Sequence, residues 1–262
     1  MTSFDNPDLP VKLRRDGAIA HVLIDRPERK NALSLEIKRL IAAAVTACQA
    51  DDAISVVMLS GAGGCFVAGT DIAEMETMTP TQHVALATDA IFHVVRKCPK
   101  IMIAAIEGYA LGGGCELALC CDLIIAGESA KLGQPEIRVG IMPGGGGTQR
   151  FVRLLGKYRA LKYLLTGEMI PAPAALQMGL LSEVVADGSA LARATELAKT
   201  ILSMPPLAVR AIKEAVDAGP DMPLDAALAF ERKAFVNLFD SDDQQEGMRA
   251  FLEKRRPVYR GS

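Results

Sequence analysis

The residue best placed to do chemistry is Glu116, which follows three consecutive glycines, Gly112 to Gly114. The apolar run from Ile101 to Ile106 precedes them and is typical of a buried strand, so the glycines open a helix shortly after a strand. Free backbone N–H groups at a helix start bind anions, and a carboxylate beside them can act as a base. This stretch therefore predicts a catalytic turn.

A second carboxylate follows further along the chain. Glu136 stands between Pro135 and Ile137, and a second glycine cluster, Gly144 to Gly147, comes after it and opens another helix, which we expect to run to about Leu155. Two carboxylates beside glycine-rich turns are suited to general acid and base catalysis.

Other kinds of site have little support in the sequence. The loop Gly61 to Asp71 lacks a complete dinucleotide fingerprint because Phe66 stands where the third glycine belongs, and Gly156-Lys157 is not part of a phosphate-binding loop. The six cysteines include no Cys-x-x-Cys pair, so we expect buried thiols and no metal or disulfide. The net charge of −2 predicts no nucleic-acid surface.

The elements that must position these carboxylates alternate between strand and helix. Val11–Arg15 and Ala18–Ile24 form a predicted hairpin, and Ser34 caps a helix. The run from Ile54 to Ser60 is apolar on both faces, which predicts a central parallel strand. We also expect a helix over 78–98 and a strand over 123–126. This order predicts an α/β fold with right-handed βαβ winding.

The rest of the chain, from Ala172 onward, is predicted to be almost entirely helical. Its helices are expected at 172–178, 189–204, 206–218, 223–238 and 241–254. They carry enough apolar surface to pack on the core or on a neighbouring subunit, and we expect an oligomer.

The glycines and glutamates after Ile101 argue against a membrane span, and the first residues lack a signal peptide, so we expect a cytoplasmic protein.

Several ordered motifs resemble the enoyl-CoA hydratase/isomerase (crotonase) family over essentially the whole chain. The similar segments are Asp25-Arg26-Pro27 with Asn31-Ala32-Leu33, Phe66 to Ile72, Gly108 to Asp122, Gly133 to Glu136, Pro143 to Arg150, and Asp242-Asp243 with Glu246-Gly247 and Phe251 to Arg255. The resemblance implies a crotonase-like spiral of ββα turns over residues 1–200, followed by a C-terminal helical trimerisation region over 201–262. It also implies a homo-oligomer, either a trimer or a dimer of trimers, and an acyl-coenzyme A thioester substrate.

The resemblance also implies the roles of particular residues. Two backbone N–H groups, of Thr70 and Gly113, would form an oxyanion hole for the thioester oxygen. The two carboxylates of the hydratases fall on Glu116 and Glu136, which favours a hydratase that adds water syn to a trans-2-enoyl-CoA, as in fatty-acid β-oxidation. This lyase reaction needs no metal and no redox cofactor. We expect Glu116, at a helix N-terminus, to be ionised and to activate water, and Glu136 to donate the proton to the α-carbon.

For the coenzyme A portion, the resemblance points to Ala68, Asp71 and Ile72. Ala73 stands where the family often has a phosphate-contacting lysine, so Arg29 or Lys30, or Lys254 with Phe251, is expected to serve instead. Pro143 and Gly144 are expected to line the pocket. The sequence looks most like bacterial hydratases of fatty-acid or phenylacetate-type degradation, including those acting on 2,3-dehydroadipyl-CoA. Arg138 and Arg150 are candidates for contact with a terminal carboxylate, or are structural ion-pair partners.

Three other functions are compatible with parts of the sequence. An isomerase of the same family would use a single carboxylate to shift the double bond. A non-catalytic protein that binds coenzyme A thioesters would not need either glutamate. A nicotinamide-dependent oxidoreductase would need the glycine fingerprint that Phe66 interrupts.

Overall fold

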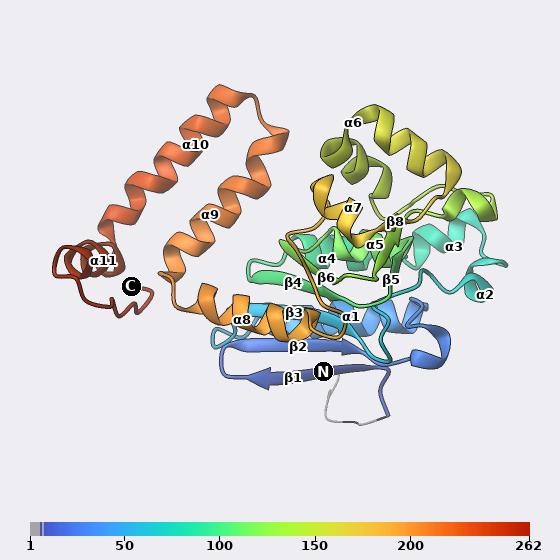
Figure 1. Cartoon of the computed structure of the whole chain (residues 1–262), viewed down its shortest axis with the longest axis horizontal. Helices are drawn as coiled ribbons and strands as arrows, with labels where there is room; N and C mark the ends of the chain where they lie inside the picture. The colour runs from blue at the N-terminus through green and yellow to red at the C-terminus, as the bar shows by residue number, and fades with distance from the viewer. Residues whose placement is uncertain (1–5, 7) are drawn as a thin grey trace. The chain divides into compact units, whose positions relative to one another are not determined.

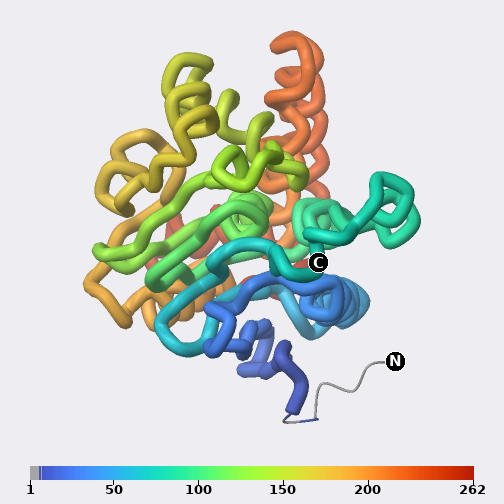
Figure 2. Tube along the Cα trace, turned by 90° about the vertical axis from the view of Figure 1, so that its right-hand side faces the viewer, coloured from blue at the N-terminus to red at the C-terminus, as the bar shows by residue number. Residues whose placement is uncertain are grey.

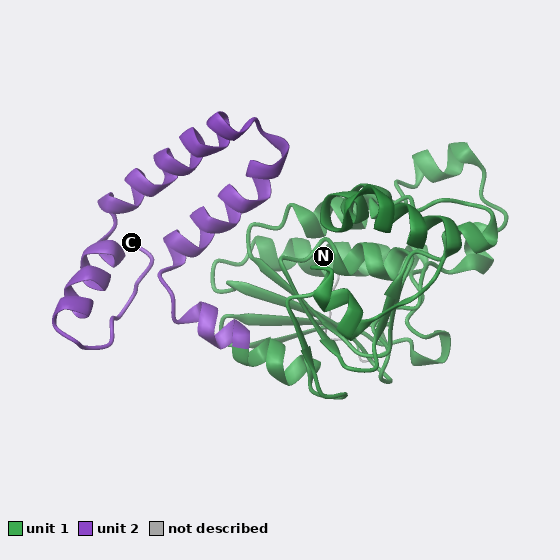
Figure 3. Ribbon diagram, turned by 45° about the horizontal axis from the view of Figure 1, so that its top comes forward, with its two compact units in different colours: residues 1–196 green, residues 197–262 purple. Residues whose placement is uncertain are grey.

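The computed structural model describes Asn6 and residues 8–262, and the chain divides into two compact units, one ending at Glu196 and the other spanning Leu197–Ser262 (Figure 3). The first unit, called unit 1, carries all the strands found among the described residues. The second, called unit 2, is helical.

Unit 1 is built on a six-stranded sheet with the order β1-β2-β3-β4-β6-β9 (Figure 1). Its first two strands are antiparallel, and every later neighbour is parallel. The strands are β1 (Val11–Asp16), β2 (Ile19–Ile24), β3 (Val56–Gly61), β4 (Ile101–Ile106), β6 (Leu123–Gly127) and β9 (Glu183–Val185). The predicted hairpin and the central parallel strand are therefore confirmed.

The core of unit 1 lies between this sheet and helix α1 (Leu35–Gln49). Ser34 begins the helix as predicted, because its side chain accepts a hydrogen bond from Ile37 N at 3.2 Å. Buried residues recur along α1 at helical spacing and meet the alternate residues of the strands. They include Ile37, Ile41 and Val45 from the helix, and Val22, Ile24, Val57, Leu59, Ala104 and Ile106 from the sheet.

A second, three-stranded sheet has the order β5-β7-β8, from Tyr109–Leu111, Lys131–Gly133 and Ile170–Pro171. Strands β5 and β7 are parallel, with Leu111 paired to Gly133, and β8 is antiparallel to β7. The sequence did not predict this sheet, because strands of two or three residues are too short to show an alternating pattern.

One of the predicted helices of unit 1 is divided in two. The single helix expected over 78–98 is two, α3 (Pro80–Ala85) and α4 (Ala90–Arg96), because Ala87 adopts a left-handed conformation with φ 45°. Figures 1 and 2 show α3 and the preceding α2 (Ile72–Met75), in teal, at the periphery of unit 1. The other elements are η1 (Pro27–Arg29), α5 (Gly113–Ala118), η2 (Glu136–Val139), α6 (Gly147–Thr166) and α7 (Ala172–Gln177).

Helix α6 is interrupted at Gly156, which has φ 73° and ψ 163°. The predicted helix therefore does end at Leu155, and a second helical stretch follows the kink under the same label.

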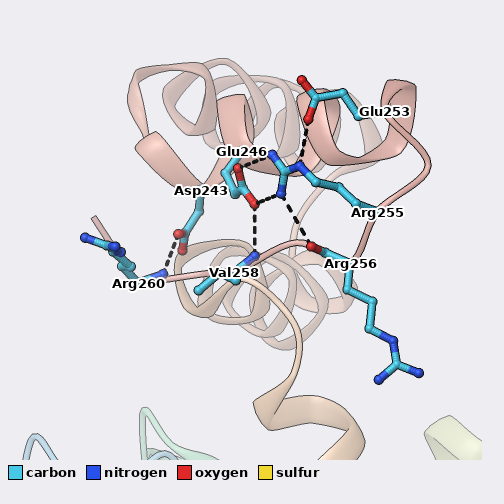
Figure 4. A network of polar contacts seen from close by, with 7 residues as sticks. All are labelled: Asp243, Glu246, Glu253, Arg255, Arg256, Val258 and Arg260. Atoms are coloured by element: carbon cyan, nitrogen blue, oxygen red, sulfur yellow. Dashed lines mark hydrogen bonds and ion pairs between the residues drawn. The ribbon is translucent and has the colours of Figure 1, made fainter.

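Unit 2 contains α9 (Pro206–Ala218), η3 (Gly219–Asp221), α10 (Leu224–Asn237), η4 (Leu238–Asp240) and α11 (Asp242–Leu252), and α8 (Ala190–Leu202) runs into it. The chain end folds back on α11 (Figure 4). Asp243 accepts hydrogen bonds from Arg260 N at 2.6 Å and Gly261 N at 2.8 Å, and Arg255 forms a two-point ion pair with Glu246. None of the described helices has the length and apolar character needed to cross a membrane.

Candidate active site

Unit 1 contains a cavity of about 540 Å³ that brings together most of the residues expected to act on a substrate. The predicted site residues in its lining are Ala68, Thr70, Ile72, Gly113, Glu116, Glu136 and Gly144. These residues come from four separate segments of the chain. Their convergence agrees with the order of motifs seen in the sequence.

The small sheet places the two glutamates near each other. Strands β5 and β7 are parallel neighbours, so their carboxyl ends lie side by side, and Gly112 N donates to Gly133 O at 2.8 Å just beyond them. Glu116 comes shortly after β5, in the first turn of α5, and Glu136 comes shortly after β7, at the start of η2. The pairing of these two strands therefore brings both carboxylates to one cavity.

Gly112 is required at this junction for two reasons. Its φ of 50° and ψ of −125° lie outside the conformations that other residues adopt readily. In addition, a Cβ atom at this position would lie 2.8 Å from Oε1 of Glu136. The glycine therefore allows the chain to turn from β5 into α5 while the carboxylate of Glu136 lies against the backbone.

Glu116 is buried, with 3% of its surface exposed. Its Oε1 accepts hydrogen bonds from Gly145 N at 2.7 Å and Gly147 N at 2.8 Å, in the second glycine cluster. Burial raises the pKa of Glu116, and these two N–H groups, Arg150 and Lys38 oppose that effect. The helix N-terminus alone had led us to expect a carboxyl that ionises more readily, but desolvation is the larger influence. In the described structure both hydrogen bonds fall on Oε1, which leaves Oε2 available to a water molecule.

Glu136 is partly buried beside Gln134 and Pro135. Burial raises its pKa from the ordinary 4.5 to about 7, and the charge of Glu116 acts in the same direction. Gln134 is fully buried, and when its amide nitrogen faces Glu136 it can donate to the two carboxylate oxygens at 3.1 and 3.3 Å. Glu136 therefore holds a proton at neutral pH more readily than an exposed glutamate, as expected of a proton donor.

The backbone at Thr70 is held next to the start of α5. Leu33 N donates to Gly69 O and Asp71 N donates to Leu33 O, at 2.8 and 3.1 Å, which fixes the chain on either side of Thr70. A Cβ atom on Gly113 would lie 2.7 Å from Oγ1 of Thr70, so the Thr70 side chain packs against the backbone at Gly113. Within the described residues the N–H groups of Thr70 and Gly113 have no hydrogen-bond acceptor. They are available to a ligand oxygen.

The remaining predicted residues lie outside the cavity lining. Asp71 precedes α2 and pairs with Arg26 Nη1 at 3.0 Å. Arg29 is exposed on η1, and the Lys30 ammonium lies 5.5 Å from the centre of the Tyr109 ring. Pro143 is buried beside Gly147, so it supports the glycine cluster and does not line the cavity. Phe251 and Lys254 belong to unit 2, where both are exposed.

The two arginines proposed for a terminal carboxylate differ in their surroundings. Arg150 Nη1 donates to Gly145 O at 3.0 Å, so this side chain stabilises the glycine cluster whose N–H groups bind Glu116. Arg138 lines the cavity, and its guanidinium forms no salt bridge with any described residue.

Several cavity residues were not identified from the sequence. They are Lys38, Met75, His83, Thr88, Asp89, Phe92, Ile141 and Met142. Most come from α1 and from the segment around the break between α3 and α4, which the sequence predicted to be continuous helix. Gly145 belongs to a cluster that was expected to line the pocket, but its hydrogen bond to Glu116 has no local signal in the sequence.

Within the described part of the chain, no group of His, Cys, Asp and Glu side chains is arranged to hold a metal ion. None of the six cysteines forms a disulfide in the described structure, and five of them are buried. Burial raises the pKa of Cys120 to about 11, so this thiol is protonated at neutral pH.

Comparisons with known proteins agree with this geometry. The model of the enoyl-CoA hydratase/isomerase family matches residues 14–262. The chain is 40% identical over 249 residues to the short-chain-enoyl-CoA hydratase of Clostridium acetobutylicum, covering 94% of this chain and 95% of that protein. It is 41% identical over 247 residues to the crotonyl-CoA hydratase of Syntrophomonas wolfei, covering 93% and 95%.

A solved structure extends the similarity to the fold. The enoyl-CoA hydratase subunit I of Geobacillus kaustophilus superposes with a TM-score of 0.94 at 43% sequence identity, covering 97% of this chain and 99% of that one. The family resemblance and the crotonase-like α/β fold expected from the sequence are thereby confirmed. The chain belongs to the enoyl-CoA hydratase/isomerase family.

Proposed function

We propose that this protein is an enoyl-CoA hydratase, which adds water to a trans-2-enoyl-CoA and releases a 3-hydroxyacyl-CoA. One observation carries the proposal: the cavity brings two glutamates, Glu116 and Glu136, together with two backbone N–H groups that have no acceptor in the described structure. The short-chain-enoyl-CoA and crotonyl-CoA hydratases that the chain resembles support the same substrate class.

The thioester oxygen of the substrate would accept hydrogen bonds from Thr70 N and Gly113 N. Negative charge grows on this oxygen when a nucleophile adds to the β-carbon, because the intermediate is enolate-like. Donors that are already oriented stabilise that charge, and one such donor is worth about 3 kcal/mol in the transition state. The burial of the surrounding residues strengthens the effect because it excludes competing water.

The two glutamates would then divide the transfer of protons. Glu116 takes a proton from water through Oε2 as the water oxygen bonds to the β-carbon, and Glu136 gives its proton to the α-carbon. The water is added across the double bond on one face, and no electrons are exchanged with a cofactor. The raised pKa of Glu136, about 7, favours its role as the acid, and the hydrogen bonds from Gly145 and Gly147 hold Glu116 for its role as the base.

We further propose that the active protein is a homo-oligomer, a trimer or a dimer of trimers, in the cytoplasm. Unit 2 supports assembly because its helices expose large apolar side chains, among them Ile212 at 63%, Val216 at 66% and Phe251 at 82%. Light scattering on the purified protein would give the number of subunits directly.

The proposal is tested by following the loss of the ultraviolet absorbance of the conjugated thioester in crotonyl-CoA. Glu116→Gln and Glu136→Gln are each expected to lower kcat by at least about a hundredfold, since each removes a general acid or base. Glu128→Gln is the matched control, because Glu128 is exposed and lies outside the cavity. A double-bond isomer as product would favour the isomerase, and tight binding without turnover would favour a non-catalytic protein.

A further inference from the structure

Lys38 is a charged side chain in the cavity to which the proposed hydration assigns no contact with the substrate. It follows the buried Ile37 on α1, but its own side chain is partly buried and lines the cavity that holds Glu116. Burial lowers the pKa of the Lys38 ammonium. A lysine is rarely placed in such surroundings without acceptors for its hydrogen bonds.

The ammonium of Lys38 is incompletely satisfied. It donates one hydrogen bond, to Thr88 O at 3.1 Å, in the segment between α3 and α4. Among the described residues it has no other hydrogen-bond acceptor and no carboxylate within salt-bridge distance. An ammonium group has three N–H donors, so two remain for a ligand or for water. A buried donor without an acceptor is costly, which favours a ligand that supplies one.

Lys38 lies close to the place where the reacting part of the substrate would sit. It shares the main cavity with Glu116 and Thr70, and it shares with Thr70 a small adjoining cavity of about 10 Å³. The charges of Glu116, Glu74 and Asp89 all act on the ammonium. Lys38 therefore lines the cavity in which the proposed acyl thioester would bind.

These neighbouring charges restrict the kind of acceptor that fits. The charges of three carboxylates already act on this one ammonium, so their repulsion disfavours a further carboxylate on the acyl chain. A neutral oxygen, such as a hydroxyl or a ketone, can accept the hydrogen bond without adding charge.

We propose that Lys38 is a specificity residue that donates a hydrogen bond to a neutral oxygen on the acyl chain, so that the protein prefers oxygen-bearing acyl thioesters over unsubstituted ones. This inference rests on the proposed function only in assigning the cavity to an acyl-coenzyme A thioester. It extends that function by naming a substrate class.

Binding can be measured without turnover, by titration calorimetry with saturated thioesters that cannot be hydrated. The probes are hexanoyl-CoA and its analogues with a hydroxyl at the fourth, fifth or sixth carbon. At least one analogue is expected to bind the wild-type protein about tenfold more tightly than hexanoyl-CoA. A gain of this size is what one added hydrogen bond from a charged donor typically contributes to binding. Lys38→Met should abolish this difference while leaving the affinity for hexanoyl-CoA within about twofold.

Lys97→Met is the matched control, because Lys97 is exposed at the end of α4 and lies outside the cavity. It should keep the tenfold preference. If every hydroxyl analogue binds the wild-type protein as hexanoyl-CoA does, water satisfies Lys38 and the inference is wrong, whether or not the variant folds. A Lys38-dependent preference for hexanedioyl-CoA over the hydroxyl analogues would also overturn it.

The outcome is separable from that of the proposed function. A protein that binds hydroxyhexanoyl-CoA through Lys38 but does not hydrate crotonyl-CoA would retain this inference and lose the hydratase assignment. If the protein hydrates crotonyl-CoA but shows no Lys38-dependent preference, the hydratase assignment stands and this inference is wrong.

Discussion

Replacing Glu136 with glutamine is expected to stabilise the folded protein at alkaline pH while it removes the proposed proton donor. The pKa of Glu136 is raised by burial, so the folded state favours the protonated carboxyl. As pH rises from 4.5 towards 7, the folded state keeps a proton that the unfolded chain releases. The free energy of unfolding of the wild type must fall over this range, and Glu136→Gln has no such proton to lose.

The size of the effect follows from the change in pKa. One pKa unit corresponds to about 1.36 kcal/mol, so a rise from 4.5 to about 7 costs on the order of 3 kcal/mol once the carboxyl is ionised. Hydrogen bonds from Gln134 to the ionised carboxylate would reduce this cost, which makes 3 kcal/mol an upper value. Glu136→Gln should therefore be more stable than wild type by roughly 2–3 kcal/mol at pH 8, and by under about 1 kcal/mol at pH 5.

Denaturant unfolding of the two proteins at pH 5 and pH 8, at one protein concentration, measures this double difference. At each pH, the difference between the free energies of unfolding of the two proteins cancels the contributions of groups that titrate alike in both. The exposed Glu128→Gln serves as the control for removing a carboxyl at the protein surface. An equal stability difference at the two pH values would refute the idea that burial holds a proton on Glu136.

Three further predictions follow from the same structure. The kcat/KM for crotonyl-CoA should fall tenfold per pH unit above about 7, as Glu136 loses the proton that it donates, and a flat profile to pH 9 would contradict this role. Gly113→Ala should lower kcat by about 10²-fold, because the added Cβ would lie 2.7 Å from Thr70 Oγ1. Adding Thr70→Ala to this variant should restore most of the activity, since the proposed donor at residue 70 is the backbone N–H. Failure of this rescue would argue against the close packing of Thr70 on Gly113. Asp243→Ala should lower the free energy of unfolding by about 2 kcal/mol without changing kcat, because two backbone N–H groups of the chain end lose their acceptor. An unchanged denaturant midpoint would be inconsistent with these hydrogen bonds.

The long elements were predictable because their patterns are local. The strand at Ile101–Ile106 has the predicted bounds, and Glu116 lies in the first turn of a helix, as the glycines indicated. Ser34 caps α1, and the helix after the second glycine cluster ends at Leu155. In each case a run of apolar residues, a cap or a glycine marks the boundary in the sequence itself.

The details that complete the candidate site are set by contacts distant in sequence. The pairing of β5 with β7 joins Glu116 to Glu136, yet each of those strands has only three residues. The break at Ala87 was missed because the apolar spacing continues through it without glycine or proline. Lys38 was not singled out from the sequence, because only the packing of α1 beside the α3–α4 segment places it in the cavity.

The central claim is that Glu116 and Glu136 together add water to an enoyl thioester. Mass spectrometry of the product formed from crotonyl-CoA in deuterated water tests it most directly. The account predicts a product heavier by one molecule of heavy water, with one carbon-bound deuterium at the α-carbon. It predicts that Glu116→Gln and Glu136→Gln each form this product at least about a hundredfold more slowly than the wild type. Recovery of unhydrated thioester from the wild type, or the same product in full yield and rate from both variants, would contradict it.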